Sequence, residues 1–305
     1  MPALDLPRSI GATPLVELPS FTPAPRVRIL AKLEGNNPGG SVKDRPALYM
    51  FRAAERAGAL GPGKILLEPT SGNTGIAFAM LGAARGVPVT LTMPACVSEE
   101  RRAVLAAFGA EVLLTPAEEG TDGAILAARA MAAEHADRYF MPDQYSNPAN
   151  PLAHYETTGP EIWRQTDGTV DVFVAGMGTS GTLMGTGRFL KERKPGVRIV
   201  GVEPRLGHRV QGLKNMREAI VPPIYDPGRL DLKLTVEDEV AFETARALAR
   251  HEGLFVGMSS GAAVAGALEV ARTLEEGTIV VLLPDRGDRY LSTNLFRSVC
   301  ARCPP

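Results

Sequence analysis

Short apolar runs alternate with helical patterns along almost the whole chain, and this order of elements constrains the fold more than any other feature of the sequence. The apolar runs have strand length and are bounded by Gly and Pro, whereas the segments between them have the apolar spacing of helices. Strands are predicted over 27–34, 64–69, 88–93, 110–115, 170–176, 197–203 and 278–284. Helices are predicted over 45–58, 74–86, between the cap Ser98 and Gly109, and over 121–136, 152–165, 181–193, 236–252 and 261–274. This alternation indicates an α/β fold with mostly parallel sheets that are covered by helices on both faces.

The length of the chain indicates two lobes. A chain of 305 residues exceeds what one hydrophobic core usually supports. The turn-rich stretch SNPANP at 146–151 separates a first series of elements from a second one. Residues 205–233 contain Pro222, Pro223 and Pro227 and lack periodicity, so we expect a long functional loop there. Each lobe is expected to be an open twisted sheet flanked by helices.

The composition excludes several classes of partner. The formal net charge is −1, from 33 basic and 34 acidic residues that are interspersed, so a surface that tracks nucleic-acid phosphates is not expected. No apolar run reaches the length of a membrane span, and the N-terminus lacks the pattern of a signal peptide. The cysteines Cys96, Cys300 and Cys303 do not make a disulfide framework or a zinc site, and they favour a reducing, cytoplasmic location.

The turn NPGGSVKDR at 37–45 joins a predicted strand to a predicted helix. One interpretation is an ordinary surface turn in which Lys43 is a solvated charge. A cation is disfavoured at a helix N-terminus, however, because the helix dipole is positive there. A lysine held at that position has its ammonium form destabilised, which suits a Schiff-base nucleophile and general base.

The loop TSGNTG at 70–75 directly follows a predicted strand and opens the next helix. An ordinary capping turn would use one hydroxyl, whereas this loop carries three hydroxyls and an amide. Such a loop at a helix N-terminus is a good cradle for a carboxylate. We therefore favour a binding function over a simple cap.

The loop GMGTSGT at 176–182 also lies between a predicted strand and a predicted helix. Its composition lets backbone N–H groups approach an anion closely. It also satisfies the pattern G-x-G-x-x-G, and Glu203 lies 22 residues past Gly181 at the end of the next strand. A dinucleotide site is therefore a real alternative at this loop.

The three loops together discriminate between these alternatives. A non-enzymatic, dinucleotide-binding regulator would use the third loop and leave the other two without a function. Pyridoxal 5′-phosphate (PLP) would use all three, because it needs a lysine for its aldehyde, a cradle for the carboxylate of an amino-acid substrate, and a Gly/Thr/Ser loop for its phosphate. The set therefore favours a PLP enzyme.

Five motifs carry a resemblance to a known family: NPGGSVKDR, TSGNTG, QYSNPANP, GMGTSGT and GMSSGAAV. They occur in the order seen in the cysteine synthase/cystathionine β-synthase family of fold-type II PLP enzymes, and the resemblance covers essentially the whole chain. PDRGDRYLST resembles the cysteine synthase B branch, and GLKNMREAIVPPIYDP is similar to synthases that use O-phosphoserine. The resemblance implies a fold like that of the tryptophan synthase β subunit. It implies a larger PLP-binding domain of residues 1–44 and 151–305, and a smaller, mobile substrate-binding domain of residues 45–150.

The resemblance also implies a role for each matching residue. Lys43 is the Schiff-base lysine, Asn73 hydrogen-bonds the 3′-oxygen of the cofactor, and Ser259, rather than Ser260, faces its pyridine nitrogen. The cofactor phosphate is bound by Gly178, Thr179, Ser180, Gly181 and Thr182. The substrate carboxylate is held by the loop and a glutamine, namely Thr70, Ser71, Gly72, Thr74 and Gln144. Lys214 is also expected to bind substrate, and it stands where related enzymes tend to carry an arginine. Because lysine lacks the bidentate fork that grips a phosphate, this residue weakens a preference for O-phosphoserine without excluding it.

The activity implied by the resemblance is a β-replacement that forms L-cysteine through an α-aminoacrylate intermediate. The substrates would be O-acetylserine or O-phosphoserine together with sulfide, thiosulfate or carrier-bound sulfur. Cystathionine β-synthase and serine/threonine dehydratase are the alternatives on the same fold. The family implies a homodimer, with a serine acetyltransferase or a sulfur-carrier protein as partner, and no metal.

Overall fold

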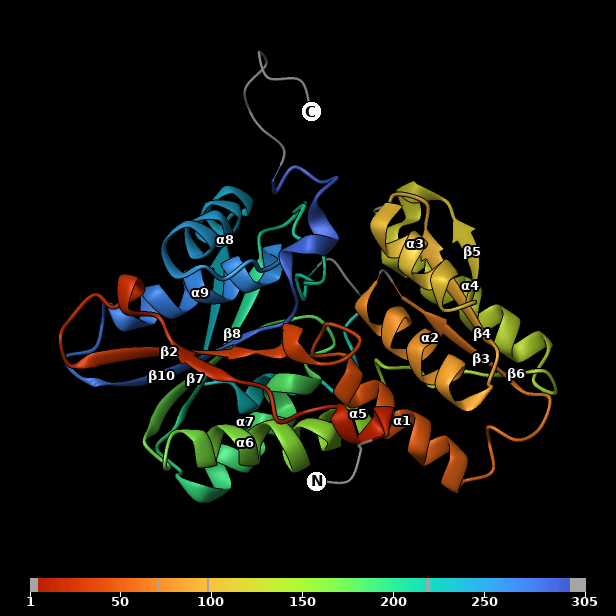
Figure 1. Ribbon diagram of the computed structural model, residues 1–305, viewed down its shortest axis with the longest axis horizontal. Helices are drawn as coiled ribbons and strands as arrows, with labels where there is room; N and C mark the ends of the chain where they lie inside the picture. The colour runs from red at the N-terminus through yellow and green to blue at the C-terminus, as the bar shows by residue number, and fades with distance from the viewer. Residues whose placement is uncertain (1–4, 71, 98, 218–219, 297–305) are drawn as a thin grey trace, which may run out of the picture.

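Two separate sheets lie side by side in the computed structural model, which describes residues 5–70, 72–97, 99–217 and 220–296 (Figure 1). The larger sheet has the strand order β1-β2-β10-β7-β8-β9, and the smaller one has the order β5-β4-β3-β6. The larger sheet consists of β1 (Leu15–Glu17), β2 (Val27–Leu33), β7 (Val170–Gly176), β8 (Arg198–Pro204), β9 (Leu232–Val236) and β10 (Gly277–Leu283). The smaller sheet consists of β3 (Ile65–Pro69), β4 (Val89–Pro94), β5 (Glu111–Thr115) and β6 (Tyr139–Phe140).

Neighbouring strands pair in parallel throughout both sheets, except for the antiparallel pair β1–β2. Parallel pairs need crossover connections, which are mostly helical here. The α-helices are α1 (Asp44–Arg56), α2 (Asn73–Arg85), α3 (Glu99–Ala107), α4 (Gly120–Glu134), α5 (Ala149–Ala153), α6 (Gly159–Gln165), α7 (Gly181–Arg193), α8 (Asp238–Glu252) and α9 (Met258–Ala271). A π-helical turn η5 (His154–Thr158) joins α5 to α6. Short 3-10 turns are η1 (Leu6–Ser9), η2 (Pro19–Phe21), η3 (Glu34–Asn36), η4 (Ala117–Glu119), η6 (Pro227–Arg229) and η7 (Gly287–Tyr290).

Helices cover both faces of the larger sheet. Successive side chains of a strand point to opposite faces, and in β7 Val172 packs into the core shared with α8 and α9, whereas Phe173 packs into the core shared with α7. Helices α8 and α9 lie on one side of this sheet and α6 and α7 on the other (Figure 1). The strands are therefore buried on both faces, which explains their continuous apolar sequences.

The smaller sheet has the same layered construction. Leu66 of β3 belongs to a core that includes residues of α1, α2 and α3. Its neighbour Leu67 packs on the opposite face with Ala128 of α4. Strands β3 to β6 are contiguous in the sequence, so residues 65–140 supply all four strands of this sheet.

The structure confirms the α/β class and the predicted helices and strands, except that the single helix predicted over 152–165 is divided into α5, the π-helical turn η5 and α6. The prediction of a loop over 205–233 is wrong at its end, because β9 begins at Leu232 and pairs with β8. Strand β9 lies at the edge of its sheet, where Leu232 and Leu234 are half-buried and Lys233 and Thr235 are exposed. Such an alternating strand lacks the continuous apolar run that identified the central strands.

The loops after β3, β7 and β10 contribute to a single cavity, as expected for ligand sites at the carboxyl ends of parallel strands. Ser71, Ser98, Cys300 and Cys303 lie outside the described residues. Within the part of the chain that the structure describes, no helix is long and apolar enough to cross a membrane. The same residues contain no cluster of His, Cys, Asp or Glu side chains suited to a metal ion.

Candidate active site

A cavity of about 460 Å³ brings most of the predicted site residues together. This volume suits a small ligand such as a cofactor with an amino-acid substrate. The predicted residues that line it are Lys43, Thr70, Gly72, Asn73, Thr74, Gln144, Gly178, Thr179, Thr182, Lys214 and Ser259. Ser180 and Gly181 are buried behind this lining. Ser71 cannot be placed, since it lies outside the described residues.

Lys43 occupies the N-cap position of α1, at the end of a tight glycine turn. Gly40 adopts a positive φ of 79°, and the Gly39 N–H donates to the Asp44 carboxylate at 2.5 Å. Burial lowers the pKa of the Lys43 amine, although the carboxylates of Asp285 and Glu34 oppose this shift. The lowered pKa favours the neutral amine, which is the form that acts as nucleophile or base. Burial is the largest cause of this shift.

The loop at the start of α2 is tied to a glutamine from a distant segment. The Thr74 hydroxyl donates to the Gln144 side-chain oxygen at 2.7 Å, and the Gln144 amide nitrogen donates to the Pro69 carbonyl at 3.3 Å. The Thr70 hydroxyl accepts from the Gly72 N–H at 3.1 Å. The first N–H groups of a helix have no partner within the helix. This arrangement therefore offers backbone and side-chain donors to an anion such as a carboxylate.

Gln144 is itself positioned by a buried carboxyl group. Glu68, near the end of β3, accepts from the backbone N–H groups of Asp143 and Gln144, each at 3.0 Å. Burial raises the pKa of Glu68 to about 8, against the opposing effect of these hydrogen bonds. The segment that carries Gln144 is thus anchored to the strand that precedes the Thr70 loop.

The loop before α7 has the features of a phosphate site. Ser180 is the N-cap of this 13-residue helix and has a positive φ of 68°. Its hydroxyl is buried and has no hydrogen-bond partner among the described residues. A Cβ on Gly181 would come within 2.0 Å of the Asn150 side chain, so glycine is required there. A helix N-terminus with an unused buried hydroxyl fits the phosphate of PLP, because both supply donors to an anion.

His154 lies directly behind this loop, in the π-helical turn. Its Nδ1 lies 2.9 Å from the Thr158 hydroxyl, and its Nε2 lies 3.3 Å from the Thr182 hydroxyl. Burial lowers the pKa of His154 to about 3, so the ring is neutral near pH 7. The imidazole therefore supports Thr182 without adding charge to the site.

Ser259 lies in the first turn of α9 and lines the cavity, whereas its neighbour Ser260 does not. The Ser260 hydroxyl is buried and has no hydrogen-bond partner among the described residues. The geometry thus favours the choice of Ser259 over Ser260 for the side chain next to a bound ring. A serine is neutral, so it does not enforce a positive charge on a ring nitrogen.

The dinucleotide alternative is not supported by the position of Glu203. Its carboxylate forms an ion pair with Lys233 at 2.9 Å and accepts from the Met216 N–H at 3.1 Å. Glu203 is buried and does not line the cavity. The acidic residue that would bind a ribose is therefore already engaged elsewhere.

Several lining residues were not identified from the sequence. Arg101 of α3 is one of them. Arg101 belongs to an EERR run on a helix, a pattern typical of a solvated surface. Its side chain is nevertheless buried and donates to the Tyr290 hydroxyl at 2.9 Å. No periodicity distinguishes such an arginine, since its burial comes from the distant turn η7, which packs against α3.

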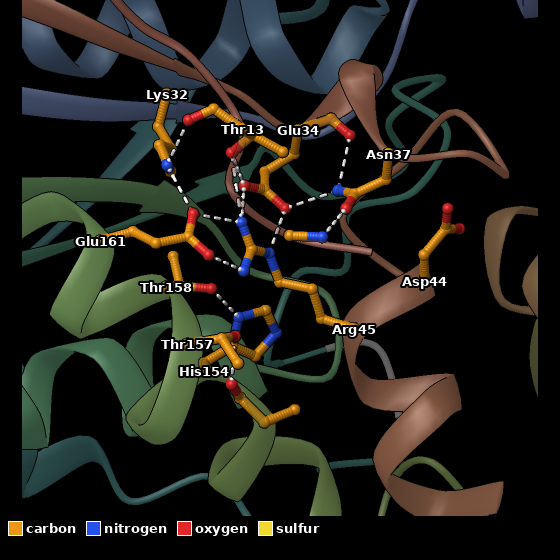
Figure 2. Close-up of polar contacts among 12 residues, drawn as sticks. Thr13, Lys32, Glu34, Asn37, Asp44, Arg45, His154, Thr157, Thr158 and Glu161 are labelled. Atoms are coloured by element: carbon orange, nitrogen blue, oxygen red, sulfur yellow. Dashed lines mark hydrogen bonds and ion pairs between the residues drawn. The ribbon is translucent and has the colours of Figure 1, made fainter. Parts of the chain in front are cut away.

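Figure 2 shows a buried ionic cluster around Arg45, which follows Lys43 by two residues in the sequence. The Arg45 guanidinium donates to the Glu34 carboxylate at 2.7 and 2.8 Å and to the Glu161 carboxylate at 2.7 Å from each of two nitrogens. Lys32 donates to Glu161 at 2.7 Å. Asn37 joins the cluster by donating to Glu34 at 2.9 Å. Two cations and two anions thus neutralise one another.

The two carboxylates of the cluster stay charged at neutral pH because each is surrounded by donors, which lower the pKa values of Glu34 and Glu161. Burial alone would raise the pKa of Glu161, but the hydrogen bonds and charges of Arg45 and Lys32 outweigh it and lower the pKa to about 2. Asn37 and Arg45 flank the glycine turn on either side of Lys43. The cluster therefore fixes both ends of the segment that carries the candidate catalytic amine.

Comparison with known proteins agrees with these observations. A family model described as pyridoxal-phosphate dependent enzyme matches residues 6–285. A cysteine synthase of Aquifex aeolicus is 50% identical over 295 residues, covering 94% of this chain and 90% of that protein. A cysteine synthase B of Salmonella typhimurium is 48% identical over 291 residues, covering 95% of each protein. The crystal structure of a cysteine synthase (OASS) from Entamoeba histolytica matches with a TM-score of 0.91 and 40% identity, covering 97% of this chain and 91% of that one.

Proposed function

The chain belongs to the family of pyridoxal-phosphate dependent enzymes, and from this premise we propose that it forms L-cysteine by replacing the β-substituent of an activated serine with sulfur. The observation that carries the proposal is that a lysine of lowered pKa, a carboxylate cradle and a phosphate loop line or border one cavity. The cysteine synthases that resemble the chain over nearly their whole length support the same reaction.

The cofactor supplies the electron withdrawal that labilises the Cα proton of an amino acid. The Lys43 amine would hold the cofactor when no substrate is bound. With substrate bound, the Lys43 amine would take the Cα proton as the β-substituent leaves Cβ with its bonding electrons, and it would return a proton to Cα after the sulfur nucleophile has added at Cβ. Burial lowers the pKa of Lys43 and thereby favours the neutral amine, which is the form that can accept the proton.

The rest of the proposed site holds the two molecules in place. The backbone donors of residues 178–182 and the hydroxyls of Thr179, Ser180 and Thr182 would bind the cofactor phosphate. Ser259 would lie at the ring nitrogen, and Asn73 at the 3′-oxygen. The donors around Thr70, Gly72, Thr74 and Gln144 would bind the carboxylate of the substrate.

Replacing Thr74 with alanine tests the carboxylate site. The change removes a hydroxyl from the loop and its 2.7 Å bond to Gln144. Gln144 then loses the contact that orients its amide toward the substrate carboxylate. Because hydrogen bonds to charged groups contribute about 1.5–3 kcal/mol, we expect KM for the activated serine to rise about tenfold or more. The visible absorption of the bound cofactor should not change. Thr74→Ser is the matched control, and an unchanged KM in Thr74→Ala would contradict the assignment.

The contacts of Lys214 favour O-acetylserine over O-phosphoserine as the activated serine. Its ammonium donates to Asp122 at 3.0 Å and lies 5.2 Å from the centre of the Tyr145 ring. A phosphate dianion would have to compete with the carboxylate of Asp122 for this single charge. A neutral acetyl ester needs no such charge. We therefore propose O-acetylserine as the better substrate.

Steady-state assays of each serine ester with sulfide test this preference. We expect the larger kcat/KM with O-acetylserine in the wild-type enzyme. Asp122→Asn should raise kcat/KM for O-phosphoserine by roughly tenfold, because it releases the Lys214 charge, and should leave O-acetylserine within about twofold. Lys214→Met should abolish that gain. A wild-type preference for O-phosphoserine, or an Asp122→Asn variant that gains nothing, would contradict the proposal.

The assembly, the location and the domain movement are proposals of the same kind. The resemblance to cysteine synthases supports a homodimer, and a serine acetyltransferase or a sulfur-carrier protein as partner. The small number of cysteines supports a reducing, cytoplasmic location. The separate four-stranded sheet supports a mobile domain of residues 45–150 beside a domain of residues 1–44 and 151–305.

A further inference from the structure

The segment that follows β10 contacts both the Lys43 turn and the start of α2, although the proposed mechanism assigns no role to it. The Val42 N–H donates to the Pro284 carbonyl at 2.8 Å, and Ser41 pairs with Asp285 as an isolated bridge. The next residues form the turn η7, which carries Arg289 and Tyr290. Asp285, Arg289 and Tyr290 are all buried.

Two charged side chains from this segment hold the amide of Asn73 at both ends. The Asn73 amide nitrogen donates to Asp285 Oδ2 at 2.6 Å, and the Asn73 oxygen accepts from Arg289 Nη1 at 2.5 Å. A carboxylate can only accept and a guanidinium can only donate. If the amide were flipped, its N–H groups would point at the Arg289 cation and its oxygen at the Asp285 anion. Neither contact would be a hydrogen bond. The orientation of the amide is thus determined by its two partners.

One N–H of the Asn73 amide can still donate to a ligand in the cavity. An asparagine NH₂ group has two hydrogens, and Asp285 takes one of them. Asn73 is the first residue of α2 and lines the cavity. Its remaining N–H is therefore available to an oxygen of a bound ligand, whereas its carbonyl oxygen is turned toward Arg289.

Arg289 also connects the amide to the Lys43 turn. Its Nη2 donates to the Gly39 carbonyl, which belongs to that turn. A Cβ on Gly40 would lie within 2.4 Å of the same guanidinium, so the turn must carry glycine at this position. One side chain thereby fixes Asn73 relative to the segment that bears Lys43.

Asp285 is held in turn by a chain of contacts that reaches the smaller sheet. The Tyr290 hydroxyl donates to Asp285 Oδ2 at 2.6 Å and accepts from Arg101 at 2.9 Å. The Arg101 guanidinium also lies 5.0 Å from the centre of the Tyr290 ring. Because Arg101 belongs to α3, this series of contacts joins the two lobes beside the cavity.

We propose that Asp285 and Arg289 are positioning residues that orient the Asn73 amide, so that its free N–H donates to the 3′-oxygen of the bound cofactor. The inference rests on the proposed function, since it needs PLP with that oxygen next to Asn73. Neither residue is placed at the reacting atoms. Arg289 acts through Asn73, whereas Asp285 acts through Asn73 and also as a negative charge that raises the pKa of the Lys43 amine. Fixing a donor in advance avoids the cost of ordering it when the ligand binds.

The test uses the full chain reconstituted with PLP and two readouts that do not depend on activity. These are the dissociation constant of the cofactor and the position of its visible absorption band, which responds to a hydrogen bond at the 3′-oxygen. Asp285→Asn and Arg289→Met should each shift the band in the direction that Asn73→Ala shifts it, and weaken binding about tenfold. Arg289→Lys, which keeps a donor, should restore part of the loss.

The decisive measurement is the double variant Asn73→Ala/Arg289→Met. If Arg289 acts through Asn73, this variant should bind PLP no more weakly than Asn73→Ala alone. Arg286→Met is the matched control, because Arg286 is exposed and its side chain pairs with Asp288 at 3.1 Å. It should leave both readouts unchanged.

The failure of this inference can be told apart from a failure of the proposed function. If the wild-type protein takes up no PLP, the proposed function itself is contradicted. Normal uptake with an unchanged band in Asp285→Asn and Arg289→Met, or additive losses in the double variant, would overturn the inference alone. Thermal unfolding of the cofactor-free variants checks the fold. If Arg289→Met is unfolded, the nearly isosteric Asp285→Asn decides the question.

Discussion

Replacing Lys43 with alanine is expected to abolish cysteine formation, with a loss of at least about 10³-fold, because one amine serves as covalent anchor and as base. The structure gives this amine a lowered pKa through burial and places it in the cavity with the carboxylate cradle. No other lysine of the described residues combines these features, since Lys214 is paired with Asp122. Assays with a serine ester and sulfide measure the loss.

The covalent role of Lys43 has a separate readout. After incubation with PLP and reduction with borohydride, the wild-type chain should gain the mass of the reduced cofactor on the peptide that contains Lys43. Lys43→Ala should gain none, and the control Lys191→Ala, whose lysine pairs with Asp231 at 2.9 Å, should label normally. Because a buried amine of lowered pKa adds little stability, cofactor-free Lys43→Ala should unfold within about 1 kcal/mol of wild type. Cofactor attached to another lysine would contradict the assignment.

Replacing Arg45 with alanine is expected to destabilise the fold by about 3–5 kcal/mol, because it leaves two buried carboxylates without their shared cation. The Arg45 side chain is almost completely buried and donates to both Glu34 and Glu161. Taking charges out of water is costly, and only a complete set of partners compensates for that cost. The free energy of unfolding, from urea denaturation of the cofactor-free protein, measures the change.

An exposed ion pair provides the control for Arg45. Arg85 and Glu55 approach to 3.8 Å at the surface, and Arg85→Ala should change the free energy of unfolding by less than about 1 kcal/mol. Adding Glu34→Gln to Arg45→Ala should recover part of the loss, because one uncompensated charge is removed. A loss below 1 kcal/mol in Arg45→Ala would mean that water or a rearranged side chain replaces the guanidinium.

The succession of elements could be predicted because central parallel strands are buried on both faces. Strands β7, β8 and β10 carry continuous apolar runs, and Gly or Pro marks their ends. Edge strands lack that signal. β9 alternates half-buried and exposed residues, and its start was predicted as part of a loop. β1 and β6 are only three and two residues long, and neither was predicted.

The site could be predicted in part, because the loops that bind anions need particular residue types. Glycine, threonine and serine at 176–182 provide close backbone approach and donors, and the same reasoning applies to TSGNTG at 70–75. Arg101 and Arg289 gave no such signal, since a single arginine has the same appearance in sequence whether it is exposed or buried.

The sequence by itself determined the α/β class, the order of its elements and the three loops with binding chemistry, because local apolar patterns and turn residues decide these features. Only the tertiary structure decided that the loops share one cavity, that burial lowers the pKa of Lys43, and that Arg289 and Asp285 orient Asn73. Each of these depends on contacts between residues that are far apart in the chain. Asn73 and Arg289, for example, are 216 positions apart, and no local pattern records a contact of that kind.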